Sequence, residues 1–443
     1  MTVRISSRNI WTASLPLILA GLGETLADVT DTIFLSRYGV TEVGAVAIAD
    51  SVHELLFVLA VGLGEALQIV VARRAGERRS HRVGQAVAQS ALLFMAAALL
   101  AFPLLRWVAP AFTDQALASG EVGAAAGDFL RVISWGVLFD AANILWIAFY
   151  IGIGRTRAIA GAIAIMTATN ILLDWGLIFG HLGLPRLGIE GAAWSAVISD
   201  AAACLFFVAH AWRRGDLVAY GLLRRAPWNP MLAGRLFVLG WPVAAEKLLH
   251  AARWFAFFLI VEQLGAAPLA VSNMVHALYV LLLIPIEGFS ETTCTLVSHA
   301  LGARRPEDVR VVLRRAIGLG YVVLAPFLAA CVLWPGPVLE LFADDVALLP
   351  GAAASLSALL LAMLVAVPGE MLVSAVVGTG DTRGALGIEA VVTLFTLLYI
   401  VAAALLLHWP LHVVWLVVAA GWCLRVALAV ARLRSGRWVD ARV

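Results

Sequence analysis

Charged residues are scarce in this chain of 443 residues: Asp, Glu, Lys and Arg together make up 14%, whereas hydrophobic residues make up 62%. The mean hydropathy of +0.94 excludes an ordinary soluble domain. Cysteine is also rare. The four cysteines fall within apolar runs and show no CxxC or Cys/His spacing, so we interpret them as small buried residues rather than as a disulfide framework or a zinc site.

Several functional patterns are missing as well. The sequence contains no HExxH, no GxSxG and no paired Asp-rich motif, which makes an integral-membrane enzyme the less favoured class. It contains no segments of about 10 residues with alternating polarity, as a membrane β-barrel would require. The net charge of +2 reflects arginines placed around apolar runs, so no nucleic acid partner is expected.

Long apolar runs fill the chain instead, and each is long enough to cross about 30 Å of hydrocarbon as a helix. The first run follows a short basic stretch without a convincing cleavage site, so we interpret it as a retained helix. The runs predict an all-α polytopic membrane protein with twelve transmembrane helices. Their approximate ranges are 10–36, 41–72, 82–112, 121–151, 157–180, 188–212, 231–264, 268–300, 308–334, 346–378, 384–408 and 411–432.

The orientation of these helices is predicted from the arginines, because cytoplasmic loops are enriched in positive charge. Arginines gather between runs 2 and 3, between runs 6 and 7, and between runs 8 and 9, whereas the alternate connections carry few arginines or several acids. With an even number of spans, both termini are expected in the cytoplasm. The expected location is the inner (plasma) membrane of a bacterial cell.

The sequence contains an internal repeat whose two copies are related by one constant offset. Pro16 and Pro242 are 226 residues apart (242 minus 16), and the same offset aligns Gly39 with Gly265, and "GIGRTR" with "GTGDTR". We therefore predict an N-lobe at 1–212 (helices 1 to 6), a cytoplasmic linker at 213–230 and a C-lobe at 231–443 (helices 7 to 12). Two parallel six-helix lobes would be related by a pseudo-two-fold axis along the membrane normal, an arrangement typical of transporters, although duplication also builds channels and scaffolds.

The motifs together resemble the multidrug and toxic compound extrusion (MATE) family. The motifs in question are Pro16 followed by "DTIFLSRYG", then "ARRAG", "GIGRTR", "NILLDWGLIFG", "GIEGAAWSA" and "GTGDTR". The resemblance covers essentially the whole chain. It implies a twelve-helix, two-lobe efflux transporter driven by inward flow of protons or sodium ions, in which a helix 1 carboxylate takes part in cation coupling.

Four oxygen-bearing side chains are predicted in one layer of the outer half of the N-lobe: Asp31, Asn170, Asp174 and Ser195. Asp31 lies six residues before Arg37 near the end of helix 1, about 9 Å along the helix, and the other three have matching depths. The layer would suit a sodium ion at Asp31 and Asp174, or two carboxyl groups that share a proton. A static hydrogen-bonded group remains the alternative, and Asn170 would then only bridge helices.

The resemblance maps onto the same layer. Asp31 falls at the helix 1 coupling aspartate, and Asn170 with Asp174 falls at the Asn-x-x-x-Asp pair of helix 5. The chain departs from the family in helix 6, where Ala196 replaces a more usual threonine, so Ser195 or Ser199 is expected to supply the fourth oxygen.

Further ionisable residues at membrane depth are candidates for a proton relay or for substrate binding, because charge at that depth is costly to keep. Arg131 is the predicted counter-charge for these acids, and His53 is either a relay or a satisfied hydrogen-bonding residue. The candidates in the N-lobe are Glu24, Asp28, Asp50, His53, Glu54, Arg131 and Asp140.

The C-lobe carries a different cluster at the seventh helix. Glu246, His250 and Arg253 recur at helical spacing, and Lys247 between them is the only lysine of the chain. Some relatives place a cation-site glutamate where this chain has His250, so a sodium site of that kind is not expected here. The cluster is either a structural group of ion pairs or a protonation or substrate site. Glu287 and Glu370 are added as possible partners of a cationic substrate.

The predicted function is a proton- or sodium-coupled antiporter that exports amphipathic, cationic small molecules by alternating access. It needs no cofactor besides the coupling ion. Its expected partners are organic cations and the lipid bilayer, and it is expected to act as a monomer. A lipid-linked precursor flippase of the same superfamily is the alternative, disfavoured because acids predominate within the spans, and a channel remains possible.

Overall fold

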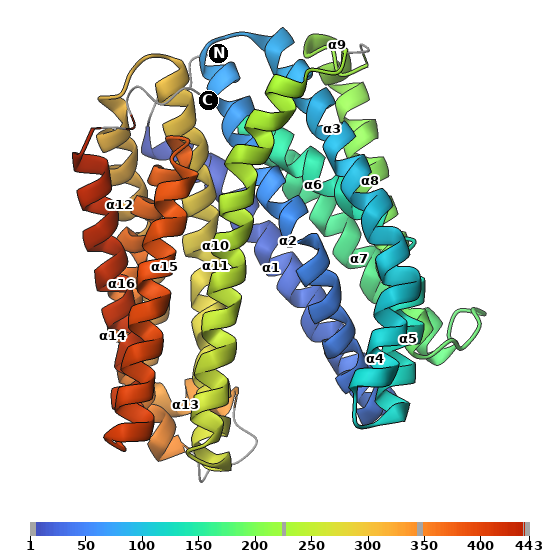
Figure 1. Ribbon diagram of the computed structural model, residues 1–443, viewed down its shortest axis with the longest axis vertical. Coiled ribbons are helices and arrows are strands. Elements are labelled where there is room, and N and C mark those ends of the chain that lie inside the picture. The colour runs from blue at the N-terminus through green and yellow to red at the C-terminus, as the bar shows by residue number, and fades with distance from the viewer. Residues whose placement is uncertain (1–5, 224–226, 343–348, 437, 439–443) are drawn as a thin grey trace. The chain divides into compact units, whose positions relative to one another are not determined.

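The computed structural model describes residues 6–223, 227–342, 349–436 and 438, and within these ranges it contains helices and loops but no strand (Figure 1). The first half of the chain contains α1 (Ser7–Tyr38), α2 (Val40–Gly76), α3 (Ser80–Pro103), the π-helical turn η1 (Leu104–Val108), α4 (Ala109–Ala116), α5 (Gly120–Ile133), α6 (Val137–Gly152), α7 (Arg157–Phe179), α8 (Ile189–Arg213) and α9 (Asp216–Ala219). The second half contains α10 (Pro230–Glu262), α11 (Ala266–Gly302), α12 (Asp308–Leu333), α13 (Pro335–Glu340), α14 (Leu349–Gly378), α15 (Thr382–Ile400), the π-helical turn η3 (Val401–Leu406) and α16 (Leu411–Arg434).

Ten described helices are long and apolar enough to span a membrane, or eleven if α5 and α6, which meet at a bend of 60°, form one broken span. The remaining long helix, α10, is also long enough, but three charged residues, Glu246, Lys247 and Arg253, interrupt its apolar character. The expectation of an all-α polytopic membrane protein is therefore confirmed.

The chain divides into two compact units. One comprises Leu19–Ala244, here called the N-lobe unit, and the other comprises Met1–Ile18 with Ala245–Val443, here called the C-lobe unit. Both divisions fall two residues after a proline inside a helix, Pro16 in α1 and Pro242 in α10. The sequence repeats begin before those prolines. The first part of α1 therefore packs in the C-lobe unit, and the first part of α10 packs in the N-lobe unit.

Close backbone contacts between glycines and helices explain this assignment in the N-lobe unit. A Cβ atom added to Gly62 of α2 would lie 2.7 Å from the backbone nitrogen of Ala244 and even closer to the carbonyl oxygen of Gly240. Only a glycine leaves room for the backbone of α10 at that position.

The C-lobe unit repeats the contact with residues 226 positions away. A Cβ atom on Gly288 of α11 would lie 2.6 Å from Cγ1 of Ile18 and 3.3 Å from the carbonyl oxygen of Ser14. The Ser14 hydroxyl also donates a hydrogen bond to Thr292 Oγ1 at 2.9 Å. Ile18 and Ser14 correspond to Ala244 and Gly240 at the repeat offset. The same helix contact therefore occurs at equivalent positions of the two units.

This contact predicts that Gly288→Val lowers the melting temperature of the purified protein, because the added side chain has no space and overpacking costs about 1–3 kcal/mol. Gly318→Val on α12 is the matched control, since a Cβ atom at Gly318 meets nothing within 4 Å. Thermal unfolding in detergent measures both variants. Equal melting temperatures for the two variants would contradict the prediction.

The repeats also share an ion pair with its charges exchanged. Arg155 in "GIGRTR" pairs with the buried Asp216 of α9, whereas its repeat equivalent Asp381 in "GTGDTR" accepts two hydrogen bonds from Arg432 of α16, at 2.5 Å and 3.1 Å. Each pair connects a loop between two membrane spans to a later helix, α9 in the first repeat and α16 in the second. Within the linker predicted at 213–230, the described residue Asp216 is thus held against the N-lobe unit by Arg155.

Candidate functional site

A group of buried and half-buried polar side chains lies where α1, α7 and α8 meet in the N-lobe unit. It consists of Asp31, Asn170, Asp174 and Ser195, here called the acid site. The Ser195 hydroxyl donates a hydrogen bond to Asp174 Oδ1, and the Asp31 side chain is hydrogen-bonded to both Asp174 and Asn170. Asp174 and Ser195 are 0% exposed and Asn170 is 5% exposed. The structure therefore brings together all four side chains that depth alone placed in one layer.

Contacts on both sides of Asp31 set the register of α1 against α7. Toward the start of α1, the Thr167 hydroxyl donates to the carbonyl oxygen of Gly23 at 3.0 Å, and a Cβ atom on Gly23 would lie 3.0 Å from the Ile163 side chain. Toward its end, the rings of Phe34 and Phe179 meet edge to face at 5.8 Å. Because Asp31 lies between these contacts, its side chain is held at the level of Asp174.

A second glycine contact brings α8 to the same place. A Cβ atom on Gly191 would lie 2.7 Å from the backbone of Leu177, so the two helices approach closely there. Ser195 is one turn after Gly191, and Asp174 is about one turn before Leu177. Ser199, the other candidate for the fourth oxygen, donates instead to the carbonyl oxygen of Ala196.

Three oxygen atoms of the acid site are buried and have no hydrogen-bond donor among the described residues: Asp31 Oδ1, Asn170 Oδ1 and Asp174 Oδ2. Unsatisfied acceptors in a dry environment cost free energy, and two carboxylates at hydrogen-bonding distance repel each other when both are ionised. A proton or a small hard cation would relieve both of these costs. Within the described residues, no three His, Cys, Asp or Glu side chains converge as a metal site.

The other acids predicted along α1 and α2 lie near the acid site. Glu24 and Asp28 are exposed on α1, and Glu54 is exposed on α2. Asp50, also exposed on α2, is close enough to Asp28 and Asp31 to interact with their charges. The structure thus places Asp50 of α2 beside the acids of α1.

Arg131 is not the counter-charge of these acids. Its Nη1 atom lies 2.5 Å from Asp128 Oδ1, three residues earlier on α5, and both side chains are about half exposed. The backbone of Arg131 also accepts a hydrogen bond from Arg106. Arg131 lies at the same depth in the membrane as the acids. Its side chain, however, extends toward Asp128 on its own helix, α5.

A second pair of acids, which sequence reasoning left incomplete, lies between α6 and α8. Asp140 was a candidate, but its partner Asp200 was missed, although an acid inside the sixth apolar run is itself a visible signal. The two side chains are hydrogen-bonded to each other. His53 turns toward this pair, with Nε2 lying 3.2 Å from Asp140 Oδ2, and stacks on Phe57.

The charged cluster of the C-lobe unit centres on Glu389 of α15. Arg253 Nη1 donates to Glu389 Oε1 at 2.8 Å, and Arg425 of α16 donates to Glu389 Oε2. His250 Nδ1 lies 3.0 Å from Arg253 Nη2. All three charged residues are buried, so this geometry supports the structural reading of the cluster, and Arg425 is a member that the sequence reasoning missed.

The remaining C-lobe candidates surround this cluster. Glu370 Oε1 lies 3.9 Å from Arg425 Nη1, and Glu246 and Lys247 interact electrostatically with Arg425 and Glu370 respectively. Glu287 is exposed on α11. The charge of Glu370 is already matched by neighbouring cations, which leaves less of it available to a cationic substrate.

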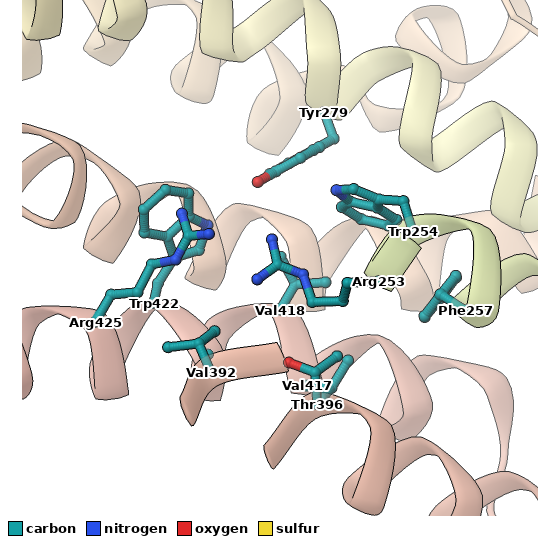
Figure 2. A pocket seen from close by; sticks show the side chains of 11 residues that line it. Arg253, Trp254, Phe257, Tyr279, Val392, Thr396, Val417, Val418, Trp422 and Arg425 are labelled. Carbon is teal, nitrogen blue, oxygen red and sulfur yellow. The ribbon is translucent and has the colours of Figure 1, made fainter. Parts of the chain in front are cut away.

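A pocket beside the cluster occupies the repeat-equivalent position of the acid site. Phe257, Thr396 and Gly421 line it, and they correspond at the offset of 226 to Asp31, Asn170 and Ser195. Figure 2 shows the guanidinium groups of Arg253 and Arg425 close to the aromatic side chains of this pocket. At the positions of the two carboxylates, Asp31 and Asp174, the C-lobe unit has Phe257 and Ile400, and the basic side chains of its pocket come from other positions.

Comparison with known proteins adds to this picture. Residues 16–175 and 242–414 match the model of the MatE family, so both matched segments begin at the helix-breaking prolines of the two repeats. The probable multidrug resistance protein NorM of Aromatoleum aromaticum is 30% identical over 343 residues, covering 74% of this chain and 71% of that protein. The probable multidrug resistance protein NorM of Rhizobium meliloti is 25% identical over 337 residues, covering 74% and 70%.

Solved structures are similar over nearly the whole chain. A crystal structure of MATE in complex with MaL6 has a TM-score of 0.88 at 20% identity, covering 98% of this chain and 97% of that one. An outward-facing multidrug resistance MATE family transporter of the MOP superfamily has a TM-score of 0.87 at 21% identity with the same coverage. At such identities the likeness shows the fold.

Proposed function

This chain belongs to the MatE family, and we propose that it is a proton-coupled antiporter that exports amphipathic, cationic small molecules across the membrane. The relatives named as multidrug resistance proteins support the export of small molecules. The observation that carries the coupling is the acid site, where two hydrogen-bonded carboxyl groups and three unsatisfied buried oxygens require positive charge.

The proposed mechanism uses the change of charge at the acid site. With a proton bound, Asp31 and Asp174 share a hydrogen bond and hold α1 against α7. Without it, two neighbouring carboxylates repel each other, and α1 can swing about Pro16, where the helix lacks a backbone hydrogen bond. Antiport then requires only that the proton and the substrate prefer opposite conformations.

Exposed acids of the N-lobe unit would attract a cationic substrate. Glu24, Asp28 and Asp50 are exposed although they lie in spans, and such residues commonly mark a substrate or ion pathway. The arginine-rich loops support insertion in a bacterial inner membrane with both termini in the cytoplasm.

Purified protein in liposomes tests this function. Efflux of a fluorescent organic cation is measured separately under an imposed pH gradient and an imposed sodium gradient, with protein-free liposomes as the control. We expect efflux to respond to the pH gradient and not to the sodium gradient. A response to sodium alone would assign the acid site to a sodium ion, and a response to neither would overturn the antiporter.

A further inference from the structure

The transmembrane part of the N-lobe unit holds more carboxyl groups than one bound cation could neutralise. Its carboxyl groups come from five helices and are faced by one imidazole, that of His53. In the part of the chain that the structure describes, none of these acids pairs with Lys or Arg. They are Glu24 and Asp28 and Asp31 of α1, Asp50 and Glu54 of α2, Asp140 of α6, Asp174 of α7 and Asp200 of α8.

Asp140 and Asp200 form a self-contained pair within this group. Their side chains lie within hydrogen-bonding reach of each other, so the two carboxyl groups can share a single proton. Asn143 Nδ2 donates to Asp200 Oδ1 at 3.2 Å and to the backbone oxygen of Asp200 at 3.1 Å, so one turn of α6 supplies both the second acid and the amide that fixes Asp200.

Two neighbouring atoms are left unsatisfied. Asn143 is 7% exposed, its amide is directed at Asp200, and its Oδ1 atom is buried without a hydrogen-bond partner among the described residues. His53 Nε2 is likewise buried without a well-aligned hydrogen bond, although it lies 3.2 Å from Asp140 Oδ2. Buried polar atoms of this kind are rare, and here two of them border the same pair of acids.

We propose that Asp140 and Asp200 form a second proton-binding site of the N-lobe unit, separate from the acid site, and that His53 delivers its proton. This inference rests on the proposed function and adds to it a coupling stoichiometry of two protons in each transport cycle. The two sites share α8 and otherwise use different helices: α1 and α7 for the acid site, and α6 for the second.

The proton transfer is a simple exchange. A protonated His53 gives the proton on Nε2 to the carboxylate oxygen of Asp140 and becomes neutral, and the new carboxyl hydrogen is then shared with Asp200. The other ionisable groups that act on the pair are Glu24 of α1, which adds negative charge near Asp200, Asp50 of α2, which interacts with His53, and Cys204 of α8.

Infrared spectroscopy of purified protein tests the site without any transport. The carbonyl absorption of protonated carboxyl groups is recorded across a pH titration. We expect Asp200→Asn to lose one carbonyl band of the protonated carboxyl groups and Asp31→Asn to lose a different band. Asp200→Glu, which keeps a carboxyl group, should retain the band that Asp200→Asn loses.

Two variants and one control separate this result from a loss of structure. Asparagine at position 200 keeps the acceptor for Asn143, and Asp140→Asn serves as a second variant. Asp128→Asn, which removes an exposed acid paired with Arg131, should match the wild type. Spectra of Asp200→Asn and Asp140→Asn identical to the wild type would overturn the proposal.

Liposomes then measure the stoichiometry at zero membrane potential. Each coupled proton supports about a tenfold substrate gradient per pH unit, because both correspond to about 1.4 kcal/mol. We expect about a hundredfold gradient per pH unit for the wild type and about tenfold for Asp200→Asn. Equal gradients in the two proteins would exclude a second coupled proton. If the wild type transports nothing, the proposed function fails, and the infrared result still decides the site.

Discussion

Asp31→Asn and Asp174→Asn are each expected to reduce gradient-driven export to the level of protein-free liposomes, while the variants still insert and purify normally. Asparagine has nearly the same shape as aspartate and keeps an oxygen that can accept a hydrogen bond from Ser195 or Asn170, so the packing of α1, α7 and α8 survives. The asparagine amide cannot take up or release a proton at any pH used for transport, so the charge of the acid site no longer changes. Without that change of charge, the proton gradient cannot drive the conformational change that exports the substrate.

The measurement is the initial rate of dye efflux at matched amounts of protein. Asp128→Asn is the control, because it removes an exposed carboxylate of the same unit that pairs with Arg131. The melting temperature of Asp31→Asn should not fall below that of the wild type, since the substitution removes repulsion between two acids. Normal export by either Asp31→Asn or Asp174→Asn would show that the acid site only holds the helices together.

Glu389→Leu is expected to destabilise the C-lobe unit by about 3–5 kcal/mol, because it leaves two buried arginines without their shared carboxylate. Arg253 and Arg425 both donate to Glu389, and the three side chains are buried. Desolvated guanidinium groups that have lost a partner repel each other, whereas Glu370 is too distant, at 3.9 Å from Arg425, to replace it fully.

Thermal unfolding in detergent checks this prediction, with Glu262→Leu, at the exposed end of α10, as the matched control. The triple variant Arg253→Met, Glu389→Leu, Arg425→Met should recover much of the lost stability, because replacing a whole buried ion-pair group by apolar residues is often neutral or favourable. A Glu389→Leu protein as stable as the control would show that water or other groups already satisfy both arginines.

The acid site was accessible to sequence reasoning because depth along a helix follows from counting residues. Asp31, Asp174 and Ser195 lie at similar distances from the ends of their apolar runs, and counting alone placed them in one layer. Arg131 shows the limit of that method. Its depth is suitable, but its side chain pairs with Asp128, and the direction of a side chain around a bent helix depends on packing.

The pairing of distant residues was likewise not accessible. Asp200 and Arg425 are visible as charges inside apolar runs, yet nothing in the order of residues says that Asp200 meets Asp140 or that Arg425 shares Glu389 with Arg253. Those partners come from different helices, so they become known only when the rotation of each helix about its own axis is known.

The sequence by itself determined the class of protein, its long apolar helices and its duplication, because span length, hydropathy and a constant offset are properties of residue order. The tertiary structure decided how the duplicated parts are used. Packing at Gly62 and Gly288 assigns the first part of α1 and α10 to the unit of the other repeat. Equivalent positions of the two repeats form an acidic group in the N-lobe unit and line a basic and aromatic pocket in the C-lobe unit, because their side chains differ.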